Sequence, residues 1–129
     1  MAGPSVRFLG RVPDEDLGRL LADCRAFLFP GLEDFGIAPV EALAAGRPVI
    51  AYAGGGALDT VKEGISGTFF YSQTVEALEE AVRGFDDSQY DPQQIAQEAK
   101  QYDTSVFKDR LGAFIQEKWD QHQSRRSPV

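Results

Sequence analysis

Glu33 and Glu41 stand eight positions apart, the first in a polar loop and the second in a predicted helix over residues 39–46. A carboxylate accepts two hydrogen bonds, so such a pair suits the vicinal hydroxyl groups of a ribose or a hexose. Each acid also has a plain structural explanation. Glu41 in the first helical turn interacts favourably with the helix dipole without a ligand, and Glu33 with Asp34 fits an ordinary solvated loop. On these residues alone both explanations stay open.

The start of this helix predicts a site for an anion. If Pro39 is the first helical residue, Ala38 is the cap and has no side-chain oxygen to accept the free amides of the first turn. Gly36 lets a ligand approach the main chain closely, and the positive end of the helix dipole points at the same spot. A diphosphate suits such a turn. The turn consists of Phe35, Gly36, Ile37 and Ala38.

Apolar segments and their spacing predict an α/β fold with a parallel sheet. Stretches of about twenty residues separate the expected strands, which leaves room for a crossover helix each time. Strands are expected at residues 6–9, 26–29, 48–52 and 68–70, and helices at residues 14–23, 39–46, 56–63 and 75–84. Gly46 is expected to form the C-terminal cap of the second helix, because glycine adopts positive φ readily.

Two helices are expected after this sheet. One covers residues 92–100, and Thr104 caps a long amphipathic helix that follows it. The apolar positions of the long helix are Phe107, Leu111, Phe114, Ile115 and Trp119. Residues 121–129 are expected to form a disordered tail, and His122 within it is not expected to take part in catalysis.

The composition is that of a single soluble domain. The chain has 129 residues, of which 43% are hydrophobic and 26% charged. It contains no apolar run of about 18 residues and no signal peptide, so the sequence predicts a cytoplasmic protein that does not span a membrane. The only cysteine, Cys24, cannot form an internal disulfide and is expected to be a small core residue.

Several chemistries are excluded. A net charge of −7 argues against nucleic-acid binding, which needs clustered cations. A lone Cys24 and a lone His122 exclude a catalytic triad and a zinc site of the usual spacing. The glycine run 54–56 lacks the third glycine of a dinucleotide fingerprint, since Asp59 stands there, and no P-loop lysine follows it. The run fits either a flexible turn or a close backbone approach to a sugar or an opposing domain.

The whole pattern closely resembles the signature of retaining GT-B glycosyltransferases of the group 1, or family four, type. This large family includes bacterial mannosyltransferases and sucrose and glycogen synthases. The resemblance rests on Glu33 and Glu41 with Phe35, Gly36 and Pro39 between them, and on the following residues 42–50. Residues 6–17, 25–30, 53–61, 63–70 and 107–115 are also similar to segments of the family. One departure is Ala57-Leu58-Asp59, where many relatives carry a proline and a glutamate, so the contact usually given to that glutamate is not carried over.

The resemblance implies a fold and a set of roles. Residues 1–120 would form part of the GT-B C-terminal, nucleotide-sugar-binding domain, with a Rossmann-like parallel sheet. Glu41 would hold the ribose hydroxyls, and Glu33 at the reaction centre would hold the hydroxyls of the donor sugar. Val12 would meet the base through its main chain. Asp34 and the amides of Phe35, Gly36, Ile37 and Ala38 would complete the donor site.

The activity implied is transfer of a hexose from a nucleotide diphosphate sugar with retention at the anomeric carbon, without a metal or other cofactor. Amide dipoles would stabilise the departing diphosphate. Resemblance to mannosyltransferase-like members favours GDP-mannose, and the acceptor stays unknown. Open alternatives are a GT-B sugar epimerase or phosphorylase, or a non-catalytic nucleotide-sugar-binding or interaction domain.

The resemblance also predicts that this chain is a fragment. Family members clamp the diphosphate with an Arg and a Lys from earlier in the domain, whereas only Arg11 and Arg47 lie near the motif here. The first βα units and the N-terminal acceptor domain are expected to be missing, so the chain alone should be inactive. Membrane association of the full-length enzyme is left open.

Overall fold

Three parallel strands form the centre of the fold, in the order β1-β2-β3. They are β1 (Phe27–Phe29), β2 (Val49–Tyr52) and β3 (Gly67–Phe70), with Phe27 opposite Val49 and Val49 opposite Gly67. The structure is a computed structural model and describes residues 3–126. The first three residues of β2 are buried, as expected for the central strand of a sheet covered on both faces.

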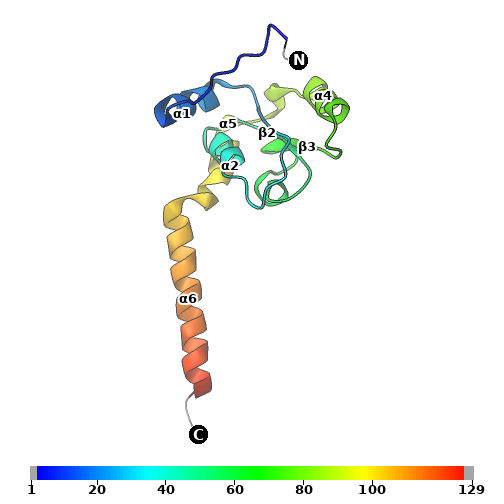
Figure 1. Cartoon of the computed structure of the whole chain (residues 1–129). Helices are drawn as coiled ribbons and strands as arrows, with labels where there is room; N and C mark the ends of the chain where they lie inside the picture. Colours follow the sequence, from blue (N-terminus) through cyan, green and yellow to red (C-terminus); the bar gives the residue numbers. More distant parts are fainter. Residues whose placement is uncertain (1–2, 127–129) are drawn as a thin grey trace.

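Helices precede, connect and follow the strands. They are α1 (Asp14–Asp23), α2 (Ile37–Ala44), α3 (Ala57–Thr60), α4 (Val75–Gly84), α5 (Pro92–Ala99) and α6 (Thr104–Arg126), with 3-10 turns η1 (Asp87–Gln89) and η2 (Lys100–Tyr102). Figure 1 shows α6 extending away from the body formed by the other elements. The predicted α/β fold with a parallel sheet and C-terminal helices is confirmed. None of the helices within residues 3–126 is both long and apolar enough to cross a membrane.

The expectation of a strand over residues 6–9 is wrong. This segment is irregular and exposed, with Phe8 at 84% of its full exposure. A strand exists only through the hydrogen bonds of a neighbour, and β1 pairs on one side only, with β2, within the described chain. The apolar residues of the segment are therefore not sufficient to form a strand in this structure.

Two other boundaries also differ from expectation. α3 ends at Thr60 instead of residue 63, because Lys62 enters a turn in which its N–H donates to Ser66 Oγ at 2.9 Å. α6 continues to Arg126, so the expected disorder is wrong for residues 121–126, and residues 127–129 lie outside the described residues.

The cap of α6 is Asp103 instead of Thr104. The Asp103 carboxylate accepts hydrogen bonds from the backbone and the hydroxyl of Ser105, at 2.8 and 2.6 Å. These bonds hold the pKa of Asp103 below its usual range. The five apolar side chains named for this helix are all exposed.

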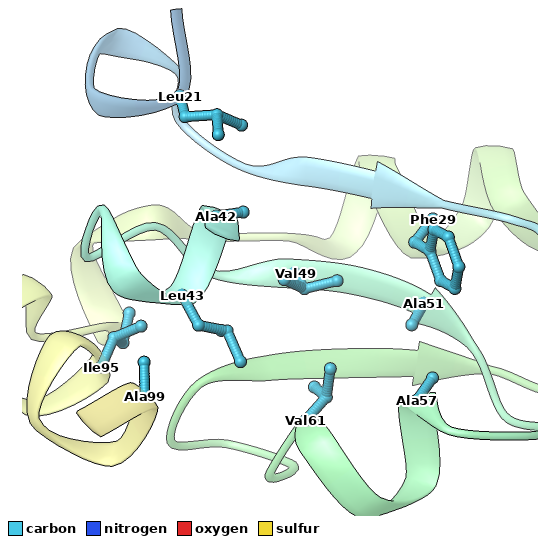
Figure 2. Packing of buried hydrophobic residues seen from close by; sticks show 10 residues of the cluster. All are labelled: Leu21, Phe29, Ala42, Leu43, Val49, Ala51, Ala57, Val61, Ile95 and Ala99. Atoms are coloured by element: carbon cyan, nitrogen blue, oxygen red, sulfur yellow. The ribbon is translucent and has the colours of Figure 1, made fainter. Parts of the chain in front are cut away.

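The core lies between the sheet and the helices α2, α3 and α5 (Figure 2). Leu43 of α2 and Ile95 of α5 are both fully buried in this cluster, and α2 and α5 pack against each other. Val49 and Ala51 cover this side of β2. The core thus fixes α2, whose first turn carries the predicted ligand site.

Replacing Leu43 by alanine is expected to lower the free energy of unfolding by about 2–5 kcal/mol, because the side chain is only 1% exposed and its removal leaves a cavity. The measurement is urea unfolding followed by circular dichroism. Leu58→Ala is the matched control, since Leu58 is 56% exposed and should change stability by about 0.5 kcal/mol or less. Equal losses in the two variants would contradict this account of the core.

Candidate functional site

The start of α2 differs in detail from the expectation. The cap is Gly36, with φ 80° and ψ 79°, and the helix begins at Ile37, so Ala38 and Pro39 are the second and third helical residues. Only glycine adopts this left-handed conformation without strain. Pro39 still costs no hydrogen bond, because the amides of the first turn have no partner within a helix. The helix therefore begins two residues before Pro39, which the sequence predicted as its first residue.

Four successive amides are free at this turn. Within residues 3–126, no acceptor takes up the N–H groups of Phe35, Gly36, Ile37 and Ala38, and no side chain caps the helix. Unpaired amides and the positive end of the helix dipole together favour a bound anion. The turn is thus chemically suited to a phosphate group.

The residues with free amides line a hollow of about 570 Å³ that two acidic residues also line. Its lining consists of Leu32, Glu33, Asp34, Phe35, Gly36, Ile37 and Ala38, which includes six of the predicted site residues. Glu33 and Asp34 are exposed, and neither carboxylate has a hydrogen bond or ion pair among the described residues. Both acids are therefore available to hydroxyl groups of a ligand.

Glu41 and Val12 are not part of this hollow. Glu41 is the fifth residue of α2, exposed, and its carboxylate also lacks a partner within the described chain. Val12 lines a separate hollow of about 380 Å³, together with Arg7, Arg11 and Arg19. The structure brings the loop residues together in one hollow, and neither Glu41 nor Val12 lines that hollow.

The glycine run after β2 supports the acidic loop, a role that the sequence reasoning missed. The N–H of Gly56 donates to the carbonyl of Glu33 at 2.8 Å. A Cβ on Gly56 would lie 2.5 Å from Asp34 O and closer still to Phe35, and one on Gly55 would overlap the Glu33 carbonyl. The signal for it was the run itself, because consecutive glycines permit backbone to lie against backbone.

Side chains from two other segments also fix the loop. Gln73, after β3, donates through Nε2 to the carbonyl of Pro30 at 3.0 Å. Tyr102 of η2 packs edge-on against Phe35, with ring centroids 5.8 Å apart, and donates to the carbonyl of Asp59 at 2.9 Å. Burial raises the pKa of Tyr102, so its hydroxyl keeps the proton that it donates.

Neither a cation nor a metal cluster accompanies the acids. No Lys or Arg of residues 3–126 lines the hollow beside α2. The described chain also contains no group of three or more His, Cys, Asp or Glu side chains that could hold a metal. Burial raises the pKa of the Cys24 thiol, against the opposing charge of Arg47, which fits a structural cysteine and not a nucleophile.

Comparison with known proteins identifies the family. Residues 1–102 match the family model described as glycosyl transferases group 1. The chain belongs to this family. The recognition made from the acidic motif and its flanking glycines is confirmed.

The relatives of this group 1 chain include mannosyltransferases, D-inositol 3-phosphate glycosyltransferases and a sucrose synthase. It is 34% identical over 120 residues to an alpha-1,3/1,6-mannosyltransferase of Rhizomucor pusillus, covering 88% of this chain and 26% of the relative. Over 63 residues it is 43% identical to the mannosyltransferase of the same name from Dictyostelium discoideum, covering 48% and 15%. The chain thus spans about a quarter or less of the length of these relatives.

Solved structures share the fold. Sucrose-phosphate synthase from Thermosynechococcus elongatus superposes with a TM-score of 0.70 at 24% identity, over 95% of this chain and 31% of the other. The Anabaena protein HepE, in complex with UDP and glucose, gives a TM-score of 0.69 at 23% identity, over 88% and 32%. At these identities the likeness concerns the fold alone.

Gly56→Ala is expected to lower the free energy of unfolding by about 1–3 kcal/mol, because the new methyl group overlaps the backbone of the acidic loop. Gly18→Ala is the matched control. A Cβ at Gly18 meets nothing within 4 Å in the exposed helix α1, so this change should stabilise by about 0.5–1 kcal/mol. Thermal unfolding measures the stability of both variants. Unchanged stability in Gly56→Ala would show that the glycine run does not support the acidic loop.

Proposed function

We propose that this chain is the donor-binding part of a glycosyltransferase and binds a nucleotide diphosphate sugar at the turn between β1 and α2. The observation that supports it most directly is the set of four free amides beside two unpaired carboxylates, in a member of the group 1 family. The amides would donate hydrogen bonds to the diphosphate, and the carboxylates would accept hydrogen bonds from the sugar hydroxyls.

The proposed roles follow the positions of the residues. The amides of Gly36, Ile37 and Ala38 bind the phosphate next to the donor sugar, where the α2 dipole adds to their effect. Glu33 and Asp34, on the same hollow, accept hydrogen bonds from the sugar hydroxyls. Glu41, one turn further along α2, takes the ribose hydroxyls, and Val12 contacts the base through its main chain.

In the proposed reaction a hexose is transferred with retention at its anomeric carbon. The bond between that carbon and the diphosphate oxygen breaks, and negative charge grows on the departing diphosphate. Fixed amide dipoles stabilise this charge without having to reorganise, which is the largest contribution that such a site can make. Glu33 orients the sugar through its hydroxyls and is not required as a nucleophile.

GDP-mannose is the donor we propose. Three named relatives of this chain are mannosyltransferases, from Rhizomucor, Dictyostelium and Escherichia coli. The Anabaena structures instead contain UDP or UDP-glucose, so UDP is the nucleotide to compare with GDP in any binding experiment.

We also propose that additional polypeptide, outside residues 1–129, completes the enzyme. The complete enzyme is proposed to act in the cytoplasm. The net charge is −7, and no cation of residues 3–126 lines the hollow, so the amides alone must hold the diphosphate. An Arg/Lys pair and an acceptor domain, supplied from outside residues 1–129, would provide the missing charge and orient the acceptor. Rate acceleration depends on that orientation.

The chain by itself is expected to bind GDP weakly, at about millimolar, because two absent charge-assisted contacts of about 1.5–3 kcal/mol each cost two to four decades from a micromolar site. Titration of isotope-labelled chain with GDP, UDP and ADP, followed by amide chemical shifts, tests the proposal. Shifts should centre on residues 33–41. Submicromolar affinity, or shifts confined to other segments, would contradict it.

Glu41→Ala is expected to weaken GDP binding at least tenfold, through loss of a charge-assisted contact of about 1.5–3 kcal/mol to ribose. The same titration measures the affinity, and thermal unfolding checks that the fold survives. Glu15→Ala on exposed α1 is the control and should leave GDP affinity unchanged. If the folded Glu41→Ala variant bound GDP with unchanged affinity, the proposed contact of Glu41 with ribose would be wrong.

Gly36→Val is expected to abolish nucleotide binding more thoroughly than Glu33→Gln. A branched side chain is strained at φ 80°, so the turn must change and its amides lose their common direction. Glu33→Gln keeps one acceptor oxygen and the backbone of the turn. GDP affinity, corrected for the folded fraction of each variant, decides the order, and normal binding by Gly36→Val would place the diphosphate elsewhere.

A further inference from the structure

Tyr102 connects three segments that are far apart in the sequence. It belongs to η2, which lies between α5 and α6. Its hydroxyl donates to the carbonyl of Asp59 in α3 at 2.9 Å, and its ring meets the ring of Phe35 in the acidic loop. The two ring planes make an angle of 74°, which is close to the edge-to-face arrangement that aromatic pairs prefer. The acidic loop is thus connected through one side chain to α3 and η2.

The turn at the start of α2 has no polar contacts that fix the direction of its amides. Within residues 3–126 the N–H groups of residues 35–38 have no acceptor. The carboxylates of Glu33 and Asp34 also have no partner there. The bond from Gly56 to the Glu33 carbonyl holds the loop two residues before Phe35. Beyond that bond, the direction of the amides depends on how Phe35 is packed.

Phe35 is packed from two directions. Its backbone lies against Gly56, where an added Cβ would be 2.4 Å from both the Cα and the carbonyl oxygen of Phe35. Its side chain is 46% exposed, and within the described residues its ring pairs with that of Tyr102 alone. The first contact restricts the backbone of Phe35, and the second restricts its side chain.

Both contacts depend on the same short helix. Gly56 is the N-cap of α3, and the Asp59 carbonyl that accepts from Tyr102 belongs to α3. Tyr102 is also partly buried, so its hydroxyl has less water to exchange its bond for. The position of Tyr102 is therefore fixed relative to the element that supports the backbone of Phe35.

We propose that Tyr102 is a positioning residue for the donor: its ring holds Phe35 and thereby keeps the amides of residues 35–38 in the direction that a diphosphate needs. This inference rests on the proposed function. Tyr102 does not contact the donor and takes no part in bond breaking. A turn that becomes ordered only when the ligand binds loses affinity by the free energy of that ordering. A contact that orders the turn beforehand therefore increases affinity for the nucleotide.

The test compares Tyr102→Leu and Tyr102→Phe in isotope-labelled chain, titrated with GDP and followed by amide chemical shifts. Tyr102→Leu removes the ring, so GDP affinity should fall about three- to tenfold, the loss expected for one aromatic pair. Nitrogen relaxation without nucleotide should show that the amides of residues 35–38 are more mobile in this variant. Tyr102→Phe keeps the ring and should restore both properties, with GDP affinity within about twofold of the unmodified chain.

Tyr90→Leu is the matched control. The ring of Tyr90 stacks on Phe85 with centroids 5.3 Å apart, and its hydroxyl donates to the carbonyl of Gly67 at 3.2 Å. Tyr90 thus makes the same two kinds of contact as Tyr102 but does not pair with Phe35. Tyr90→Leu should lower the thermal stability of the chain and leave the mobility of residues 35–38 unchanged. GDP affinity, corrected for the folded fraction, should also stay unchanged.

Phe35→Leu tests whether Tyr102 acts through Phe35. The double variant Phe35→Leu/Tyr102→Leu should bind GDP no more weakly than the weaker of the two single variants, because both changes break one contact. Losses that multiply in the double variant would show that Tyr102 acts by another route and would overturn the proposal.

The other outcomes are equally definite. Unchanged GDP affinity in folded Tyr102→Leu overturns the proposal, and so does an equal loss in Tyr102→Phe or Tyr90→Leu. If the unmodified chain shows no GDP shifts at residues 33–41, the proposed donor site is rejected. The relaxation measurement without nucleotide then still decides whether Tyr102 holds the turn, since equal mobility of residues 35–38 with and without the Tyr102 ring would show that it does not.

Discussion

One backbone contact supports the arrangement of the candidate site: the glycine run after β2 lies directly against the acidic loop after β1. Gly56 donates to the Glu33 carbonyl at 2.8 Å, and a side chain at Gly55 or Gly56 would overlap that loop. The two backbone segments can approach this closely because Gly55 and Gly56 have no Cβ atom. The loop is thereby held by a backbone hydrogen bond and close packing, although its own side chains make no polar contacts within the described chain, and its acids stay free for a ligand.

Parallel strands explain why this contact forms. The carboxyl ends of β1, β2 and β3 lie at one edge of the sheet, so the loops that follow them meet there. Gln73 after β3 bonds to Pro30 after β1, and Gly56 after β2 bonds to Glu33. Ligands of open α/β sheets bind at this edge for the same reason. The site is therefore a consequence of topology, and the three strands supply its support before any ligand is present.

Local patterns were sufficient to predict what depends on neighbours in sequence. The α1 and α4 helices and the three strands of the sheet follow from apolar periodicity, and the free amides follow from the lack of a capping side chain before Pro39. Contacts between distant segments were not predictable in this way. The pairing that residues 6–9 would need, the packing of Gly56 on Phe35 and the edge contact of Tyr102 with Phe35 all depend on where separate loops meet.

Electrostatics then limits what the site can do by itself. Amide dipoles carry partial charges, whereas a diphosphate carries full ones, and the chain around it has a net charge of −7. Glu33, Asp34 and Glu41 add to that field close to the turn, so every carboxylate that favours sugar hydroxyls disfavours the phosphates beside them. In the proposed enzyme such a site separates two requirements: recognition of the sugar by the carboxylates of this chain, and neutralisation of the diphosphate by cations from further protein. Under this proposal, tight donor binding depends on assembly of the whole enzyme, which would protect an activated sugar from water until an acceptor is in place.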